Sequence, residues 1–423
     1  MIKKRTINSY IMDLILIIYF AELVFPMINE IVNPTIVNLL CIICWIFISG
    51  LQDRSYYARP KLKIAICMLF YITTIAYSYL WGQSVIAHRY ASLALMPFAY
   101  IIYDFYSEHK QLGRLKNIIC ITFVLATITV VNTFRALLLN PYISRSIKSS
   151  GEYSAGLARQ GIGGYSFIYF VVASGIIFLH FAFVLKQMHK KILSLVAYIF
   201  SVIFVMKSNY MTALIVLLVS SLFYFVVNGC KKGKRSILYI SFISIISVVI
   251  VLNINSILNG LRDFLPARIS RVIYETGSES VFHSIAEEFL LDRWPTMQSS
   301  IEVFKKYPIF GAVGNGALIY DGSALQGLGQ HSYILDTYAF FGLIIGTWSI
   351  YVIAQPYRDK NWERNSNNIA LTVAMAVCIF SLFLFNNATE SIALVSGIIM
   401  PLIRKMNLGV SGGKYDENLS GCR

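Results

Sequence analysis

Residues 292–316 read DRWPTMQSSIEVFKKYPIFGAVGNG, and residues 331–346 read HSYILDTYAFFGLIIG. The first segment is polar and carries a helical pattern, which Pro295 can begin and Pro308 ends. Glycines then recur up to His331, so the backbone there can turn sharply or approach a ligand closely. The second segment is an apolar helix that begins beside His331. A long polar segment, a histidine and a membrane helix therefore meet in one part of the chain.

The composition of the whole chain indicates a membrane protein. Hydrophobic residues make up 57% of the 423 residues and charged residues only 13%, which is too apolar for a soluble chain of this length. Apolar runs that approach the ~20 residues needed to cross a bilayer lie at 9–29, 35–50, 63–81, 90–106, 117–139, 164–185, 192–206, 211–228, 236–256, 332–353, 368–385 and 389–403. The sequence therefore predicts an all-α, polytopic membrane protein of about 12 transmembrane helices.

The connections between these runs predict the organisation of the chain. We expect residues 1–423 to form a single integral membrane domain. A large external loop at 257–330 precedes the last three spans, and a helical pattern at 279–291 and another from Pro295 make it partly helical. The Gly-rich, polar segment 409–423 is expected to be a flexible tail.

The distribution of positive charge predicts which side each connection faces. With the N-terminus inside, the inner segments hold 24 of the 36 Lys and Arg residues. Because cytoplasmic loops carry an excess of Lys and Arg, we expect both termini in the cytoplasm and residues 257–330 outside.

The remaining basic residues are unusually rich in arginine. Eight of the 12 outer residues are Arg, whereas the inner set has more Lys than Arg. The planar guanidinium group of Arg binds phosphate through two hydrogen bonds, and the ammonium group of Lys does not. Each outer arginine can instead meet a lipid headgroup or a neighbouring carboxylate, but as a group they favour an anionic, phosphate-bearing substrate on the outer face.

Several function classes are disfavoured. The net charge of +15 is explained by topology, and no basic stripe on a soluble module indicates nucleic-acid binding. There is no P-loop, no Gly-x-Ser-x-Gly elbow, no His-Glu-x-x-His and no dinucleotide-binding fingerprint. The seven cysteines indicate neither a disulfide framework nor a zinc site. We therefore expect no metal, no cofactor and no nucleotide-driven chemistry.

The segment 292–346 resembles the O-antigen polymerase and O-antigen ligase superfamily. The resemblance rests on the Arg-Trp pair at 293–294, the helix ending in Tyr-Pro-Ile-Phe-Gly, the Gly-x-Gly, and His-Ser-Tyr-x-Leu before Phe-Gly-Leu-Ile-Gly. About 55 residues carry it, and the remaining chain agrees in layout. Ser332 and Ala339 stand where the family usually has Asn and Glu.

The resemblance implies glycosyl transfer on the outer face of the bacterial inner membrane. The donor and acceptor would be glycans linked to undecaprenyl pyrophosphate, which would be polymerised into O-antigen or capsular polysaccharide. Membrane lipids are expected partners, a chain-length regulator protein is a further partner to consider, and no nucleic acid is expected.

Such a reaction needs a base for the acceptor hydroxyl and cations for the pyrophosphate leaving group. His331 is the candidate base, because it lies beside the apolar helix and matches the family histidine. Arg159 and Arg293 are the first candidates for pyrophosphate binding, and Arg145 and Arg271 are subsidiary ones. Candidates for sugar binding are Asn387, Glu390 and Asp336, although Asn387 could equally cap a helix.

Two other activities remain open. A ligase that moves the finished glycan to lipid A-core would use the same donor and a different acceptor. A lipid-linked oligosaccharide flippase would have a similar length and hydropathy, but it is expected to have charges along its membrane path and short external loops. The gathering of charge outside the spans favours an enzyme.

Overall fold

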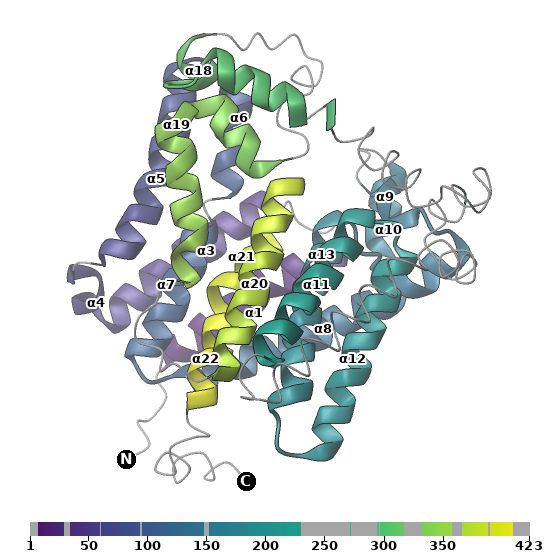
Figure 1. Cartoon of the computed structure of the whole chain (residues 1–423). Helices are drawn as coiled ribbons and strands as arrows, with labels where there is room; N and C mark the ends of the chain where they lie inside the picture. The colour runs from purple at the N-terminus through teal and green to yellow at the C-terminus, as the bar shows by residue number, and fades with distance from the viewer. Residues whose placement is uncertain are drawn as a thin grey trace. The chain divides into compact units, whose positions relative to one another are not determined.

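The computed structural model describes residues 7–28, 34–59, 61–93, 95–147, 152–229, 271, 294–295, 297–316, 332–357, 366–387 and 390–408. Helices account for the regular structure of these residues, and no strand occurs among them (Figure 1). The expected all-α class is confirmed for this part of the chain. Most of 257–330, the expected span 236–256 and the expected tail 409–423 lie outside it.

Seven described helices are long and apolar enough to cross a membrane. They comprise α1 (Ile7–Val24), α8 (Leu112–Leu139), α11 (Tyr165–Val184), α12 (Met188–Lys207), α13 (Met211–Gly229), α19 (Tyr333–Ala354) with the adjoining 3₁₀ turn η2 (Gln355–Tyr357), and α20 (Ser366–Phe385). Each corresponds to an expected span. The protein is therefore a multi-pass membrane protein.

Four expected spans have a less regular form. The apolar runs at 35–50 and 63–81 lie in α3 (Pro34–Gln52) and α5 (Leu62–Leu80), whose apolar parts are shorter. The run at 90–106 is divided between α6 (Ser84–Ser92) and α7 (Leu95–Glu108). The run at 389–403 consists of α21 (Glu390–Leu394), the π-helical turn η3 (Val395–Ile399) and α22 (Met400–Leu408). The total of about 12 spans stays a prediction.

The chain divides into two compact units. Unit 1 comprises residues 1–79, 84–170 and 389–423, and unit 2 comprises 80–83 and 171–388. The boundary falls within α11, after Phe170. The single domain expected from the sequence is not tested by this division.

Unit 1 is built around α1, which packs against α3 and α8. Small side chains of α8 allow the close approach, because Ala126, Thr129 and Thr133 are buried at helical spacing on one face. Thr129 Oγ1 donates to the carbonyl oxygen of Val24 at 2.8 Å. Polar side chains thus join the two helices without exposing a donor to the apolar surroundings.

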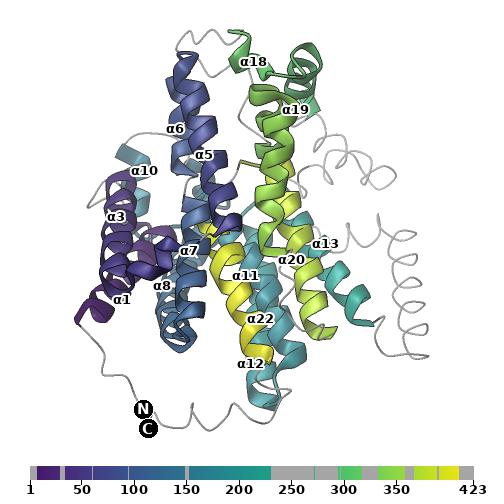
Figure 2. The ribbon, with the colours of Figure 1, turned by 90° about the vertical axis from the view of Figure 1, so that its left-hand side faces the viewer.

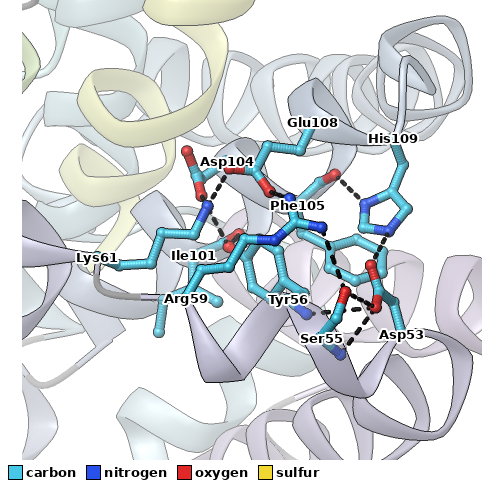
Figure 3. Close-up of polar contacts among 10 residues, drawn as sticks. All are labelled: Asp53, Ser55, Tyr56, Arg59, Lys61, Ile101, Asp104, Phe105, Glu108 and His109. Atoms are coloured by element: carbon cyan, nitrogen blue, oxygen red, sulfur yellow. Dashed lines mark hydrogen bonds and ion pairs between the residues drawn. The ribbon is translucent and has the colours of Figure 1, made fainter.

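Ion pairs gather at one end of unit 1, and Figure 3 shows those that join residues 53–61 to the end of α7. The short helix α4 (Arg54–Ala58) and Lys61 meet the end of α7, where the Lys61 ammonium group contacts Asp104 and Glu108. Asp53 contacts Nε2 of His109 at 3.0 Å. At the same end, Arg114 at the start of α8 binds Asp13 of α1 at 2.7 Å.

Titration of this cluster follows from its contacts. Hydrogen bonds from Ser55 and His109 lower the pKa of Asp53 below its usual value. Burial acts to lower the pKa of Lys61, but its bonds to Glu108 and Asp104 outweigh burial and raise it. Both groups are therefore charged at neutral pH, and the connections stay joined there.

Unit 2 contains two helix pairs. α13 packs along α20, and the helix hairpin of α12 and α13 turns at 208–210, where Asn209 has a left-handed backbone (φ 57°). α19 also contacts α20, and the short helix α18 (Gly311–Gly314) lies against α19 (Figure 2). Residues 297–306 are helical and end before Pro308, which confirms the helix expected between Pro295 and Pro308.

Candidate functional site

Two of the predicted pyrophosphate ligands lie on short helices of unit 1. Arg145 is in α9 (Ile143–Ser146) and is partly buried, and Arg159 is the exposed last residue of α10 (Glu152–Arg159). The hydroxyl group of Ser154 donates to the carbonyl oxygen of Ile147 at 2.8 Å, so that the two short helices lie together (Figure 1). The structure therefore brings both arginines into one region.

The turn after Arg159 fixes this region to the long helices. Gly161 has a left-handed backbone (φ 72°), which residues with a side chain rarely adopt, and a Cβ atom there would lie 2.8 Å from Nδ2 of Asn132. The amide of Gly163 donates to Thr133 Oγ1 at 2.7 Å. Because Thr133 belongs to the face of α8 that packs on α1, the arginine-bearing turn is held at the C-terminal end of α1.

Glu390, a predicted sugar ligand, lies at the same end of unit 1. It begins α21, and the next residue, Ser391, donates to the carbonyl oxygen of Ser166 at 2.9 Å. Ser166 is in the first turn of α11, directly after the arginine-bearing turn. Glu390 and the arginine-bearing turn therefore belong to one hydrogen-bonded framework at this end of unit 1.

Two residues of this end were not predicted as site residues. Asn38 of α3 donates from Nδ2 to Glu390 Oε2 at 3.2 Å, and Glu22 of α1 is buried beside the same amide. Each is a polar residue within an apolar run, which is costly in a membrane and marks a candidate site. That signal was present in the sequence, but nothing in it connected residues 22, 38 and 390.

The start of α19 forms a second polar region, in unit 2. Ser332 caps the helix, since its hydroxyl group accepts from the amide of Leu335 at 3.1 Å. Asp336, in the first turn, is 2% exposed and accepts from the hydroxyl group of Ser300 at 2.7 Å. The N-terminal end of a helix stabilises a carboxylate, so Asp336 is well placed as an anion and as a hydrogen-bond acceptor.

The end of α20 adjoins this region. The amide of Tyr333 donates to the carbonyl oxygen of Asn386 at 2.9 Å. Asn387, the predicted sugar ligand, follows directly and is partly buried. Unit 2 therefore brings Asp336 and Asn387 together near the start of α19.

Other predicted site residues lie largely outside the described chain. His331 and Arg293 fall there, so their roles stay predictions. Arg271 is described by itself, as an exposed residue. Ala339, where a family carboxylate would stand, is fully buried and apolar, so this position has a packing role.

The glycines of the two quoted segments contact each other within unit 2. A Cβ atom on Gly311 would lie 2.1 Å from the carbonyl oxygen of Phe340, and one on Gly342 would lie 2.1 Å from that of Ile309. Both residues have positive φ, and Gly342 interrupts the helical geometry of α19. The amide of Leu343 donates across the contact to Pro308 at 2.8 Å. The backbones of the Ile-Phe-Gly segment (309–311) and the Phe-Gly segment (341–342) are therefore in direct contact.

Three other histidines lie away from both polar regions. His180 is buried in α11 and contacts Tyr224 at 3.2 Å. His109 stacks on Phe105 and pairs with Asp53. His189 is exposed at the start of α12. The described residues contain no group of three or more His, Cys, Asp or Glu that could hold a metal ion.

The two polar regions described above, the arginine-bearing turn of unit 1 and the start of α19 in unit 2, are the observations from which a function can be inferred. No protein-family model matches the chain, and no curated protein matches it.

Proposed function

We propose that this protein is a glycosyltransferase that works on the outer face of the bacterial inner membrane. It polymerises glycan repeat units that are carried on a polyprenyl pyrophosphate. The acceptor hydroxyl oxygen forms the new bond to the anomeric carbon, and the bond from that carbon to the pyrophosphate breaks. The hydroxyl proton goes to a base, and the lipid pyrophosphate leaves with its negative charge. The product would be O-antigen or capsular polysaccharide of a bacterial inner-membrane pathway.

The observation that carries the proposal is the fixed arginine turn of unit 1. Arg145 and Arg159 lie on adjacent short helices that are bonded to α8 and, through it, to α1. A backbone held in this way keeps the two arginines at one place, where their guanidinium groups can bind phosphate through two hydrogen bonds. The resemblance of residues 292–346 to the polymerase and ligase superfamily supports the same chemistry, with His331 as the base and Arg293 as a further pyrophosphate ligand.

The roles in unit 2 follow from the same proposal. Asp336 and Asn387 lie near the start of α19, the helix that follows His331 in the sequence, and they supply an acceptor and an amide suited to sugar hydroxyl groups. Glu390 in unit 1 and Arg271 remain further candidates for sugar and phosphate binding. The proposed orientation places the arginine turn and His331 on the outer side, with both termini in the cytoplasm.

The first experiment replaces each arginine by lysine in cells that make the repeat unit. Charge-assisted bonds contribute roughly 1.5–3 kcal/mol, so Arg159→Lys and Arg145→Lys should each lower polymer formation by about ten- to a hundredfold. Glycan length on lipid A-core and membrane abundance of the protein are measured together. Arg135→Lys, an exposed position on α8, is the matched control and should keep wild-type chains.

The second variant tests the base. His331→Ala should lower polymer formation by about 10²–10⁴-fold at normal abundance, with His283→Ala as the control. Single repeat units on lipid A-core indicate a lost polymerase. Long chains that stay on the lipid carrier would indicate the ligase instead, and absence of glycan outside would indicate a flippase. Full-length chains from both lysine variants would refute the arginine role.

A further inference from the structure

Three polar side chains meet among the helices of unit 1, and we name them the carboxyl–amide cluster. Glu22 lies in the last turn of α1, Asn38 near the start of α3, and Glu390 in the first turn of α21. The Asn38 Nδ2 atom donates to Glu390 Oε2 at 3.2 Å, and the same side chain is within hydrogen-bonding reach of Glu22. Glu22 and Asn38 are each 6% exposed. One amide therefore stands between two carboxyl groups, away from water.

The hydrogen bonds of this cluster are incomplete. Glu22 Oε2 and Asn38 Oδ1 are buried and have no hydrogen-bond partner in the described chain. Both atoms can accept a hydrogen bond. The titratable groups near Glu22, other than Glu390, are Tyr19 and Cys41. The basic residues at the same end of unit 1 are Arg145 and Arg159. The side chains that act on the two carboxyl groups are Asn38 on Glu22 and Glu22 on Glu390. Among the described residues, the cluster therefore lacks one hydrogen-bond donor.

We propose that the carboxyl–amide cluster is a proton-binding site, in which Glu22 is protonated at neutral pH and donates through Oε2 to Asn38 Oδ1. A single proton satisfies both unpaired acceptors, because it converts the carboxyl oxygen of Glu22 into a donor. It also removes one of two neighbouring negative charges from an apolar interior, where an unpaired charge is costly.

The end of α1 and the hydrogen bonds of the cluster explain why the proton belongs to Glu22. Glu22 is in the last turn of α1, where the partial negative charge of the helix end disfavours a carboxylate. Glu390 Oε2 already accepts a hydrogen bond from Asn38 Nδ2, whereas Glu22 Oε2 has no partner in the described chain. Rotation of the Asn38 amide by half a turn exchanges its donor and acceptor ends, which would let Glu390 hold the proton instead. The site can therefore pass a proton between α1 and α21.

This inference goes beyond glycosyl transfer, and its test needs no glycan. Dicyclohexylcarbodiimide, an apolar carbodiimide, modifies protonated carboxyl groups within membranes, and mass spectrometry locates the adduct. The full-length protein in native membranes is treated at a series of pH values. An unperturbed Asp is about 0.1% protonated at pH 7, so the Glu22 adduct should exceed that of an ion-paired carboxylate by about a hundredfold or more.

Asp13 is the matched control, because it lies on the same helix and is paired with Arg114. In Glu390→Gln, which keeps the shape but removes the second charge, labelling of Glu22 should fall off at lower pH than in the wild type. Equal labelling of Glu22 and Asp13 would show reagent access alone and overturn the proposal. Labelling of Glu390 in place of Glu22 would overturn the assignment of the proton to Glu22. Protection of Glu22 from labelling by sodium at constant pH would show that the cluster binds a monovalent cation instead of a proton.

Discussion

Asp336 and Glu22 are both buried carboxyl residues of apolar helices, but their surroundings differ. Asp336 begins a helix and accepts a hydrogen bond from the Ser300 hydroxyl group. Glu22 ends a helix and leaves one oxygen without a donor. Helix position and partner therefore favour an anion at Asp336 and a neutral acid at Glu22. Two buried carboxyl residues can thus have different roles, Asp336 as a hydrogen-bond acceptor in unit 2 and Glu22 as a proton-binding group in unit 1.

The Ser300 contact is tested by removing its hydroxyl group. Ser300→Ala leaves the buried Asp336 carboxylate without this donor, which should lower the free energy of unfolding by about 1–3 kcal/mol. The measurement is thermal unfolding of the purified protein in detergent. Ser299→Ala is the control, because Ser299 is only partly buried and donates to the carbonyl oxygen of Pro295 in its own helix. Its melting temperature should stay within a degree or two of the wild type. Equal melting of both variants would show that Asp336 does not depend on Ser300.

Sequence reasoning located single residues better than it located their partners. Arg145, Arg159 and Glu390 were predicted from charge and position, and unit 1 places them at one end. Asn38 was missed, because a lone Asn in an apolar run gives no indication of a partner 352 positions away. Contacts of that separation depend on helix packing, which periodicity does not specify.

At the scale of elements, proline explains why two expected spans are interrupted. Pro97 is the third residue of α7, and it has no N–H that could bond to the carbonyl group of residue 93. α6 ends just before that residue, at Ser92. Pro401 lies in the first turn of α22, directly after the π-helical turn η3. A π turn accommodates the carbonyl groups that proline leaves without a helical donor. The apolar runs were read correctly, but their helical continuity was not.

The contact of Gly311 with Gly342 is an element-scale feature with a measurable requirement. Gly311→Ala or Gly342→Ala would place a methyl group 2.1 Å from a carbonyl oxygen, which the packed backbone cannot accommodate. We expect each variant to lose most of its membrane abundance, measured by immunoblot against total membrane protein.

Gly316 separates steric conflict from backbone strain. It also has positive φ, but a Cβ atom there would meet nothing within 4 Å. Gly316→Ala should therefore cost only about 1–2 kcal/mol, the strain of a left-handed residue, and should remain abundant. Loss of Gly316→Ala equal to that of Gly342→Ala would show that strain, rather than contact, explains the requirement for glycine.

At the scale of the molecule, unit 1 has two chemically different ends. Ion pairs among Asp13, Arg114, Lys61 and Glu108 close one end. The arginine turn and the carboxyl–amide cluster occupy the other. From Arg114 to Thr133 the helix α8 rises about 28 Å, close to the ~30 Å hydrocarbon core of a bilayer. The spacing is that expected if the two ends face opposite sides of a membrane.

The membrane orientation is the last prediction, and it can be tested by labelling. In a cysteine-free background that keeps wild-type abundance, Ala58→Cys lies at the ion-paired end and Tyr153→Cys near the arginine turn, and both positions are exposed. A membrane-impermeant maleimide added to intact cells should label Tyr153→Cys and not Ala58→Cys, because the excess of Lys and Arg predicts that the latter is cytoplasmic. Permeabilised cells should label both, which controls for access. Reporter fusions after Lys234 and Gly322 extend the test to the external loop, and they should report opposite sides. Labelling of Ala58→Cys alone in intact cells would invert the proposed orientation, and it would place the arginine turn on the side where nucleotide sugars, rather than lipid-linked glycans, are the available donors.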